Sequence, residues 1–557
     1  MRVSAFLGLF MGQPFDGAPK NEALTHQELP KLKVLLHSEM GGRSHNKAVL
    51  EIGQVLQERE HVVMYASSDS NEYLAREYEV PFRHLGKLEA GDERLREEFR
   101  ATLRERKHVD PLSVGSGFFV DMVGRTYNST FPRLSRLVES EQPDVMICDY
   151  LAPACRDVAN MYGIPLVTTL QTIDGMGVTM APYMTRGAQY GPITHAGMDF
   201  KSRFKDAVIT PLRSFYHYRP MVSRINRIRH KFGIPADNKP FGDLNRALVL
   251  CNTFVGFEAA APLQPNVHLI GPVLSDTHSA LDAELGEFLE AHPRTLYVAF
   301  GSLVGLAPFD IENIIAGCLL AISNGDIDGV IWGLGQTSLE DFPTSVHVND
   351  TDMSTQHLLL NQHPHMRLLS WAPQVPILRH PSTKAFLSHG GIESTFEAIQ
   401  AGTPILCMPF VGEQPRTARK LEDAGIGKYI DRIAATPKTI SKSIAHILED
   451  PSGSLQANVN RMRVLATTGS RRKHHAADLI EGFTYSAKAC RPSQPVDPSQ
   501  IPCELRHLIP ASHNMSFFKA NLLDVYLSAL IAAICIGSIS VDFFFFRFFH
   551  IINTHVK

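Results

Sequence analysis

The sequence predicts an α/β protein with two doubly wound domains and a C-terminal transmembrane helix. Apolar runs of strand length alternate with segments of helical periodicity, once from residue 33 and again from residue 295. Parallel strands that are joined by helices pack into doubly wound sheets. A long apolar segment at residues 522–549 supplies the last element of this prediction.

Length and composition agree with this class and argue against others. The 557 residues suffice for several domains, and 44% hydrophobic with 20% charged residues is typical of a globular protein. A net charge of −3 without a basic block argues against nucleic acid as a partner. The eight cysteines form no C-x-x-C pair, which argues against zinc and a disulfide-dense scaffold. The cysteine spacing leaves room for isolated disulfides.

The first domain is predicted over residues 31–274. Its predicted helices, residues 46–58 and about 152–162, each follow one buried strand and precede another, which is the pattern of a parallel sheet. The expected strands are residues 33–38, 61–67, 144–149, 164–170, 247–252 and 267–270.

A polar stretch at residues 275–292 is predicted to link this domain to a second one, at residues 293–490. The second domain repeats the alternation of strands and helices and ends in three helices. Its strands are expected at residues 295–301, 329–332, 367–371, 383–389 and 404–409, and its helices near 310–323, 394–401, 437–449, 455–467 and 471–483.

The two ends of the chain bear on its location. Residues 1–30 are an extension or a signal segment, because their short apolar run has no clear cleavage site. A Pro-rich connector at 491–521 leads to the membrane helix at 522–549, and residues 550–557 form a short basic tail. A buried core helix is the alternative for 522–549. We expect a single-pass membrane protein of the endoplasmic reticulum. A cleaved signal would place the domains in its lumen, and without one the chain is tail-anchored with cytosolic domains.

Residues 371–414 have the pattern of a ligand site. A predicted strand at 383–389 ends in His-Gly-Gly, and a helix follows directly. Unpaired backbone N–H groups and the positive end of the helix dipole make such a turn an anion site. Acidic and amide side chains nearby suit a ligand with many hydroxyl groups. A phosphate joined to a polyol is the simplest ligand that needs all of these.

The same stretch carries a family resemblance. It contains W-x-P-Q, then H-G-G-x-x-S-T-x-E, then G-T-P, then P-x-x-x-E-Q, with Trp371 first and Gln414 last. This order resembles the donor signature of the UDP-glucuronosyl and UDP-glucosyl transferases. The resemblance implies the GT-B fold, in which two Rossmann-like domains face each other across a cleft and the last helix crosses back onto the first domain.

The resemblance also implies a reaction. It is the inverting transfer of a hexose, either glucose or glucuronic acid, from a UDP-sugar to a hydroxyl group of a small lipophilic acceptor. The UDP-sugar is a co-substrate, and no other cofactor and no metal are expected. Phe118, Phe119, Met176 and Met180 hint at a lipophilic acceptor, but core packing explains them equally well.

Carried over by motif position, Trp371 would stack on uracil and Gln374 would bond the base. Glu397 would accept from the ribose, and Glu413 with Gln414 would read the sugar hydroxyl groups. The residues expected around the diphosphate are His389, Gly391, Ser394 and Thr395, with Ser302 as a further candidate.

Glu393 departs from the family pattern. Many relatives carry Asn or His at this position, whose donors can face the phosphates, whereas an acid would repel them. We therefore expect Glu393 to turn away from the site or to meet a cation.

The resemblance implies a general base after the first strand, and His45 is the histidine at that position, where open α/β sheets bind ligands. The pKa of histidine lies near neutrality, which suits proton transfer. Asp149 ends a strand of the same sheet and is expected to orient the imidazole. The alternatives are a solvated histidine and an aspartate that caps the next helix.

Two D-x-D triplets, 326–328 and 350–352, are the pattern that holds a metal in other glycosyltransferases. We expect one or two such triplets by chance and interpret both as solvated turns, so no metal is predicted. Two other functions stay open from sequence, another GT-B enzyme such as a UDP-sugar epimerase and a non-catalytic nucleotide-sugar-binding protein.

Overall fold

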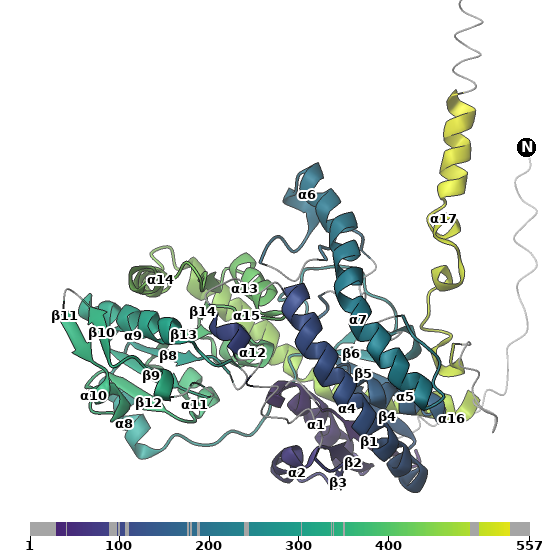
Figure 1. The fold of residues 1–557 in the computed structure, drawn as a ribbon, viewed down its shortest axis with the longest axis horizontal. Helices are drawn as coiled ribbons and strands as arrows, with labels where there is room; N and C mark the ends of the chain where they lie inside the picture. Colours follow the sequence, from purple (N-terminus) through teal and green to yellow (C-terminus); the bar gives the residue numbers. More distant parts are fainter. Residues whose placement is uncertain are drawn as a thin grey trace, which may run out of the picture.

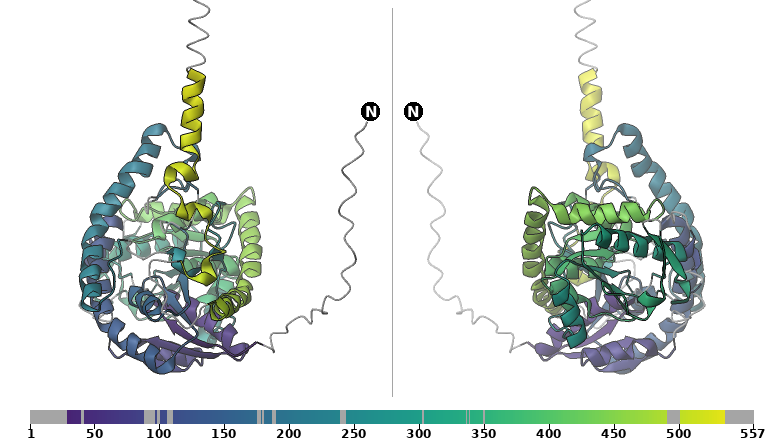
Figure 2. Two further views of the ribbon diagram at one scale, coloured as in Figure 1. Left: turned by 90° about the vertical axis from the view of Figure 1, so that its right-hand side faces the viewer. Right: turned by 90° about the vertical axis from the view of Figure 1, so that its left-hand side faces the viewer.

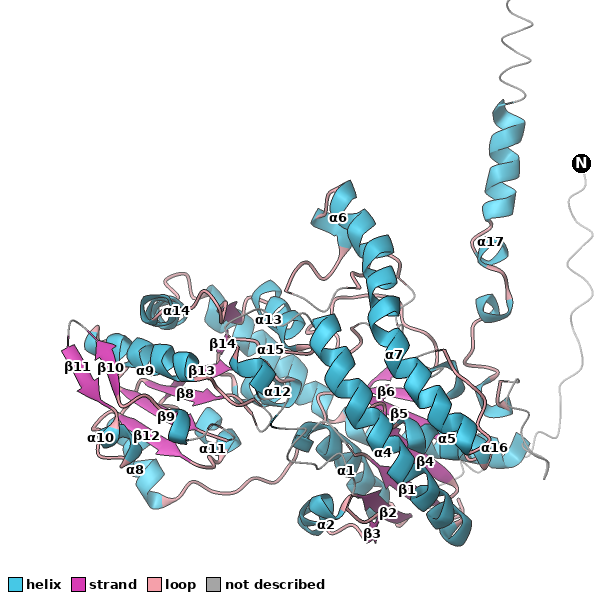
Figure 3. Ribbon diagram, viewed as in Figure 1, coloured by secondary structure: helices cyan, strands magenta, loops and turns pink. Residues whose placement is uncertain are grey.

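The computed structural model describes residues 29–39, 42–87, 97, 101–105, 111–174, 178, 181–186, 190–238, 244–301, 304–335, 337, 339–348, 351–490 and 501–534. Its strands gather into two separate groups, which are drawn in magenta in Figure 3. The predicted signal segment and basic tail lie outside the described residues, as does the connector over residues 491–500.

The first group is a seven-stranded sheet in the order β3-β2-β1-β4-β5-β6-β7, with every neighbouring pair parallel. Successive residues of a strand point to opposite faces, so Leu35 of β1 joins one apolar core while Val34 and Leu36 join the other. The strands are β1 (Lys33–His37), β2 (Val62–Ser67), β3 (Phe82–His84), β4 (Val145–Asp149), β5 (Leu166–Leu170), β6 (Leu248–Cys251) and β7 (Val267–Leu269).

Helices cover both faces of this sheet, as a doubly wound domain requires. One core contains side chains of α4, α5 and α7, and the other contains side chains of α1 and α2. A short helix and one π-helical turn precede α7 (Figure 1). The bounds are α1 (Gly42–Glu58), α2 (Glu72–Glu77), α4 (Pro111–Glu141), α5 (Pro153–Met161), α6 (Phe200–Phe204), the π turn (Lys205–Ile209) and α7 (Thr210–Lys231).

The second group is a six-stranded parallel sheet in the order β12-β9-β8-β13-β14-β15, next to a two-stranded antiparallel hairpin. The strands are β8 (Thr295–Ala299), β9 (Gly329–Gly333), β10 (Ser345–Val348), β11 (Thr351–Ser354), β12 (Met366–Leu369), β13 (Thr383–Ser388), β14 (Ile405–Cys407) and β15 (Gly427–Tyr429).

The helices of this domain also form two layers. The core on one face contains side chains of α9 and α14, and the core on the other contains side chains of α8, α11, α12, α13 and α15. The bounds are α8 (Ala283–Ala291), α9 (Pro308–Ser323), α10 (Gln356–Leu359), α11 (Gln374–Arg379), α12 (Ile392–Ala401), α13 (Gln414–Asp423), α14 (Pro437–Glu449) and α15 (Ser454–Ser470).

The predicted linker at residues 275–292 is only partly a linker. Its second half is α8, which begins after Asp282, whose carboxylate accepts a hydrogen bond from the Leu285 backbone N–H at 2.8 Å. Leu285, Phe288 and Leu289 are buried against the second sheet. The apolar spacing of this helix was hidden by its acidic residues, and the segment belongs to the second domain.

The last helix of the soluble part, α16 (Arg472–Cys490), crosses back onto the first domain, as the resemblance implied. Ala476, Ala477, Ile480 and Phe483 are buried in the same core as α1 and the first sheet. Two disulfides occur among the described residues: Cys148–Cys155 joins β4 to α5, and Cys490–Cys503 ties the end of α16 to the segment that follows it.

After α16 the described chain resumes at residue 501 and reaches α17 (Phe517–Ala520) and further helical residues at 523–534. These residues project away from both domains (Figures 1 and 2). No helix in the described part of the chain has the length and apolar character that crossing a bilayer needs. Residues 535–549 of the predicted membrane helix lie outside the described residues.

Candidate active site

His45 and Asp149 meet at the carboxyl edge of the first sheet. His45 lies in the first turn of α1, which follows β1, and Asp149 is the last residue of the adjacent strand β4. The Nδ1 atom of His45 donates to Oδ2 of Asp149 at 2.9 Å. The His45 side chain is 13% exposed and that of Asp149 is fully buried. The imidazole is therefore partly accessible, and the carboxylate that holds it is not.

The second carboxylate oxygen of Asp149 is also held. It accepts a hydrogen bond from the Leu151 backbone N–H at 3.0 Å. The N-cap residue of α5 is Ala152, so Asp149 fixes the turn before the helix and does not cap the helix itself. Two bonds on different oxygens set the orientation of the carboxylate toward His45.

The charges around His45 raise its pKa. Burial lowers the pKa of the imidazole, but the charge and hydrogen bond of Asp149 outweigh burial, with smaller contributions from Glu413 and Glu393. Burial also raises the pKa of the Glu413 carboxyl. Glu413 comes from the second domain, so the acid–base behaviour of His45 depends on groups from both halves.

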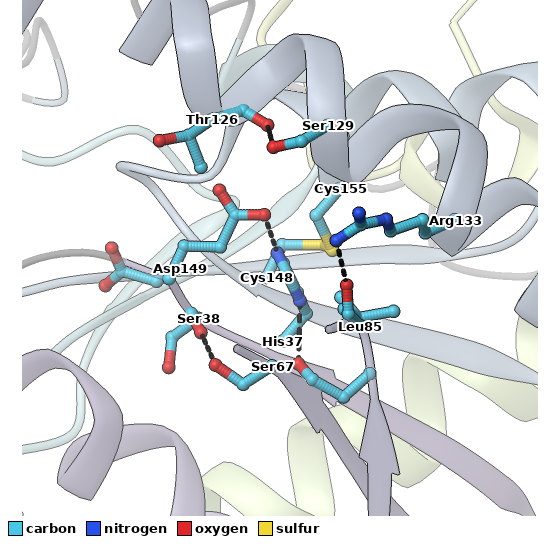
Figure 4. A network of polar contacts seen from close by, with 12 residues as sticks. His37, Ser38, Ser67, Leu85, Thr126, Ser129, Arg133, Cys148, Asp149 and Cys155 are labelled. Atoms are coloured by element: carbon cyan, nitrogen blue, oxygen red, sulfur yellow. Dashed lines mark hydrogen bonds and ion pairs between the residues drawn. A yellow bond between two sulfur atoms is a disulfide. The ribbon is translucent and has the colours of Figure 1, made fainter. Parts of the chain in front are cut away.

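His37, the other histidine near this edge, has a different environment. It is fully buried at the end of β1, where Nδ1 bonds the Ala66 carbonyl at 2.8 Å and Nε2 bonds the Glu39 carboxylate at 3.0 Å. Figure 4 shows it beside the Cys148–Cys155 disulfide and Asp149. Since both ring nitrogens are engaged, His37 is a structural residue and His45 is the one available for chemistry.

In the second domain, β13 turns into α12 through two glycines that the geometry requires. Gly390 has φ +82°, and a Cβ there would lie 2.5 Å from Cys407 Sγ. A Cβ on Gly391 would lie 2.4 Å from His389 Nε2. Burial lowers the pKa of His389 to about 4, so its ring is neutral at pH 7. The turn therefore places the neutral imidazole of His389 next to the N-terminus of α12.

Gln374 connects two of the predicted donor residues. Its Nε2 donates to Ser394 Oγ at 3.0 Å and to Glu397 Oε2 at 2.7 Å, so α11 and α12 share one polar cluster. Trp371 follows β12 and is 66% exposed, unlike the fully buried Trp332. An open indole face beside this cluster is suited to stacking against a base.

Thr395 does not join this cluster. Its side chain is fully buried, and its backbone N–H bonds the Gly391 carbonyl at 3.0 Å within the helix. Thr395 therefore lies on the core side of α12, and its buried hydroxyl has no hydrogen-bond partner among the described residues, so its role at the diphosphate stays a prediction. Ser302 lies outside the described residues, as do Met176 and Met180, and the side chains of Phe118 and Phe119 are not described.

Glu413 and Gln414 occupy the start of α13. The side-chain oxygen Oε1 of Gln414 accepts hydrogen bonds from the backbone N–H groups of Phe410 at 2.8 Å and of Val411 at 3.0 Å. The side chain therefore holds the loop before α13 through its oxygen and has its amide N–H groups left to offer a ligand.

Lys47 is a site residue that the sequence analysis missed. Its Nζ lies 3.0 Å from Glu393 Oε1 and 3.3 Å from Glu397 Oε1, so α1 of the first domain is paired with α12 of the second. Burial lowers the pKa of Lys47, but the two carboxylates outweigh burial and raise it. The expectation that Glu393 meets a cation is confirmed. The acid at position 393 indicated that a cation lies nearby, but the sequence did not identify Lys47 as that cation.

A second ion-pair cluster joins the two domains through α13, the helix that follows Glu413. Lys420 Nζ lies 2.5 Å from Asp174 Oδ2 and 2.6 Å from Glu258 Oε2, and Arg416 Nη2 lies 3.1 Å from Asp174 Oδ1. Burial raises the pKa of Asp174, but the charges of Lys420 and Arg416 outweigh burial and hold it at about 2. Arg416 and Lys420 of α13 are therefore committed to carboxylates of the first domain, whereas the third cation of this helix, Arg419, pairs with Asp423 of the same helix at 2.6 Å.

Neither D-x-D triplet approaches these groups. Asp328 precedes β9, at the amino edge of the second sheet, and accepts from the Arg294 backbone N–H at 2.8 Å. Asp352 lies in β11, and Asp350 is outside the described residues. Among the residues that the structure describes, the only metal-like grouping is Cys490, Cys503 and Glu504, and its two cysteines form a disulfide.

Comparison with known proteins gives the family. A family model described as UDP-glucoronosyl and UDP-glucosyl transferase matches residues 119–466. A UDP-glycosyltransferase from Talaromyces amestolkiae is 31% identical over 90% of this chain and 96% of that protein. UDP-glycosyltransferase stmC from Aspergillus ustus is 31% identical over 93% of this chain and 97% of that protein. The crystal structure of the glycotransferase of kitacinnamycin covers 81% of this chain and 99% of its own, with a TM-score of 0.57 and 18% identity.

The two parallel sheets and the likeness to the solved structure define the GT-B fold. Within that class, the chain belongs to the UDP-glucoronosyl and UDP-glucosyl transferase family and is a hexosyltransferase that uses a UDP-sugar. Sugar transfer is therefore favoured over the epimerase and the non-catalytic binding protein.

The ion pairs of Lys47 predict a pH-dependent loss of stability in Lys47→Met. Breaking a buried ion pair costs on the order of 3 kcal/mol, so the Tm should fall at pH 7. Burial raises the pKa of Glu397 while Lys47 lowers it, so the variant raises this pKa further. A carboxyl with a raised folded-state pKa destabilises the fold fully above that pKa, progressively less as the pH falls below it, and not at all below the unfolded-state pKa. The loss should therefore shrink as the pH falls from 7 to 5.

Scanning calorimetry of both proteins at the two pH values measures this effect. Lys428→Met is the matched control, because Lys428 makes an exposed pair with Glu422 at 3.4 Å and such pairs contribute about 0–1 kcal/mol. Equal Tm losses for Lys47→Met and Lys428→Met, or a loss for Lys47→Met that does not depend on pH, would contradict the prediction.

Proposed function

We propose that this enzyme transfers a hexose with inversion from a UDP-sugar to a hydroxyl group of a small lipophilic acceptor, with His45 as general base. The observation that carries the proposal is the His45–Asp149 pair, whose histidine lies in the same part of α1 as Lys47, and Lys47 Nζ contacts Glu393 in the first turn of α12. A base on one side and an anion site on the other is the arrangement that in-line displacement at an anomeric carbon requires.

The proposed chemistry uses both nitrogens of His45. With Nδ1 donating to Asp149, Nε2 carries the lone pair and accepts the proton of the acceptor hydroxyl. The acceptor oxygen attacks the anomeric carbon, the bond from that carbon to the diphosphate breaks, and UDP leaves from the opposite face. Asp149 stabilises the imidazolium that forms.

The donor would bind along the cluster at α11 and α12. We assign Trp371 to stacking on uracil, Gln374 to the base and Glu397 to the ribose. The diphosphate would lie at the backbone N–H groups after Gly391, with His389 and Ser394 as side-chain donors. Preorganised donors at a helix N-terminus stabilise the charge that develops on a leaving diphosphate. No metal is needed for this role.

Glu413 and Gln414 are the residues that we assign to the sugar hydroxyl groups. Three cations follow them in α13, and each has a carboxylate partner: Arg416 and Lys420 pair with carboxylates of the first domain, and Arg419 pairs with Asp423 at 2.6 Å. A carboxylate on the sugar would find no uncommitted cation from α13, so this charge distribution favours glucose over glucuronic acid. A panel of UDP-sugars, scored by UDP release, distinguishes the two.

We propose that the enzyme is a single-pass protein of the endoplasmic reticulum membrane, anchored by residues 522–549. Val525, Leu527 and Leu530, in the described part of this segment, are more than half exposed. Burial of such side chains in lipid is favourable, at about 0.8 kcal/mol for each CH₂ group. The two disulfides favour an oxidising compartment. A membrane location also suits a lipophilic acceptor.

His45→Ala tests the proposed base. Transfer should fall by about 10²–10⁴-fold, which is typical of a lost general base, while the affinity for UDP should be unchanged, because the donor residues lie in the other domain. His84→Ala is the control, since the His84 side chain is 58% exposed. Turnover of His45→Ala close to that of the control would refute the assignment.

Asp149→Asn should lower the rate and move its pH dependence. A raised His45 pKa means that the base is protonated below that pKa, so kcat/KM should fall on the acid side from above about pH 6.5. Removing the Asp149 carboxylate lowers the pKa of His45, so the acid limb of the kcat/KM profile should shift to lower pH. Asp144→Asn, at the other end of the same strand, should leave the acid limb in place. An unshifted limb in Asp149→Asn would contradict the pairing.

Transfer should persist in excess EDTA, because protein donors hold the leaving diphosphate. The measurement is UDP release before and after chelation, with added Mn²⁺ as the comparison. Activity that is lost in EDTA and restored by Mn²⁺ would mean that a metal site exists and that one of the D-x-D triplets was misinterpreted.

The full-length protein should stay in the membrane pellet after alkaline carbonate washing. A truncation after Ser512 should stay in the supernatant and still transfer sugar, because every assigned site residue precedes α13 or begins it. Immunoblotting of both fractions measures this outcome. A full-length chain that washes off the membrane would contradict the anchor.

A further inference from the structure

The tip of the first domain exposes an unusual number of large apolar side chains. They lie along α6, the π turn and the first half of α7, and their exposed fractions reach 75%. The rings of Phe200 and Phe204, one turn apart, lie 6.2 Å from each other, and exposed apolar residues recur at positions 208 and 212 through the π turn into α7, which makes a stripe. The stripe consists of Phe200, Phe204, Val208, Leu212, Phe215 and Tyr216.

The stripe is not the core-facing side of these helices. Within α7 the buried apolar residues are Met221, Ile225 and Ile228, which lie beyond the stripe in the second half of the helix and belong to the core of the first domain. No other part of the described chain covers the stripe. Contiguous exposed apolar surface on a soluble domain marks an interaction site.

The charge of this tip identifies the kind of partner. Residues 199–219 contain five Lys or Arg and two Asp. Of the two acids, Asp206 is buried and pairs with His195, and Asp199 caps α6. Lys201, Arg203 and Lys205 are exposed between the apolar residues. Aromatic and aliphatic residues flanked by lysine and arginine are typical of helices that lie at the surface of an anionic bilayer.

The direction of the tip agrees with a bilayer. In Figures 1 and 2, α6 and the helical residues 523–534 rise on the same side of the two domains, although they are far apart in sequence. The helical residues 523–534 expose apolar side chains as well, among them Val525, Leu530 and Ile531. One plane can therefore receive both segments at the same time.

We propose that α6, the π turn and the start of α7 form a second membrane contact, which docks the first domain on an anionic bilayer. A second copy of the chain is less favoured as the occupant, because two tips of like charge would repel each other. α7 packs against α4 in the first domain, so docking of the tip fixes how that domain stands on the membrane. The inference concerns a lipid contact and does not rest on the proposed catalytic residues.

The test places a tryptophan in the stripe of the full-length protein. Phe215→Trp is reconstituted with vesicles of phosphatidylcholine and phosphatidylserine, with and without brominated acyl chains. An interfacial helix is buried by about 5–10 Å at the headgroup boundary, so the new tryptophan should lose more than about half of its fluorescence to the brominated lipid. Tyr73→Trp is the matched control on α2, which lies on the opposite side of the domains (Figure 1) and is 51% exposed.

Two further variants separate this inference from other outcomes. Leu530→Trp reports insertion of the C-terminal segment by itself, so quenching at Phe215→Trp without quenching at Leu530→Trp supports the tip contact and refutes the anchor. Changing Lys201, Arg203 and Lys205 to Gln should weaken docking by about fivefold for each charge removed. Phe215→Trp quenched no more than Tyr73→Trp overturns the inference. A concentration-dependent blue shift of Phe215→Trp without lipid also overturns it, in favour of self-association.

Discussion

The pairing of charges across the cleft is the constraint on which the rest of the site depends. The proposed base comes from one sheet and the proposed donor cluster from the other, so the proposed chemistry requires that the two domains are held together. Lys47 bridges Glu393 and Glu397, and Lys420 bridges Asp174 and Glu258. Burying each of these carboxylates alone would cost free energy, and the paired cation offsets that cost. The cation and the carboxylate come from different domains, so the offset requires this relative placement of the domains.

The same coupling reaches the proposed base. His45 has its pKa raised by its own domain through Asp149 and, to a smaller extent, by Glu413 and Glu393 of the other domain. The proton affinity of the base is therefore tied to the closeness of the second domain. α16 reinforces this arrangement, because it continues from the second domain and buries Ile480 and Phe483 in the core of the first.

Several parts of this arrangement were predictable from the chain. The strands of both sheets are short apolar runs bounded by turns, and the His-Gly-Gly turn predicts the start of α12 directly. His45 and Asp149 were predictable because the ends of neighbouring parallel strands share an edge. By contrast, α8 was hidden among polar residues, and the inward position of Thr395 depends on which side of α12 faces the sheet.

The sequence by itself determined the local features, namely the alternation that makes two doubly wound sheets, the glycine turn before α12 and the acid at position 393 that needs a cation. These are fixed by neighbours in the chain, because side-chain periodicity and backbone sterics act over a few residues. Only the tertiary structure decided that Lys47 is that cation, that Arg416 and Lys420 are already paired, and that the stripe on α6 and α7 stays uncovered. Those outcomes depend on contacts such as Lys47 to Glu397, whose partners come together through domain packing and leave no local pattern.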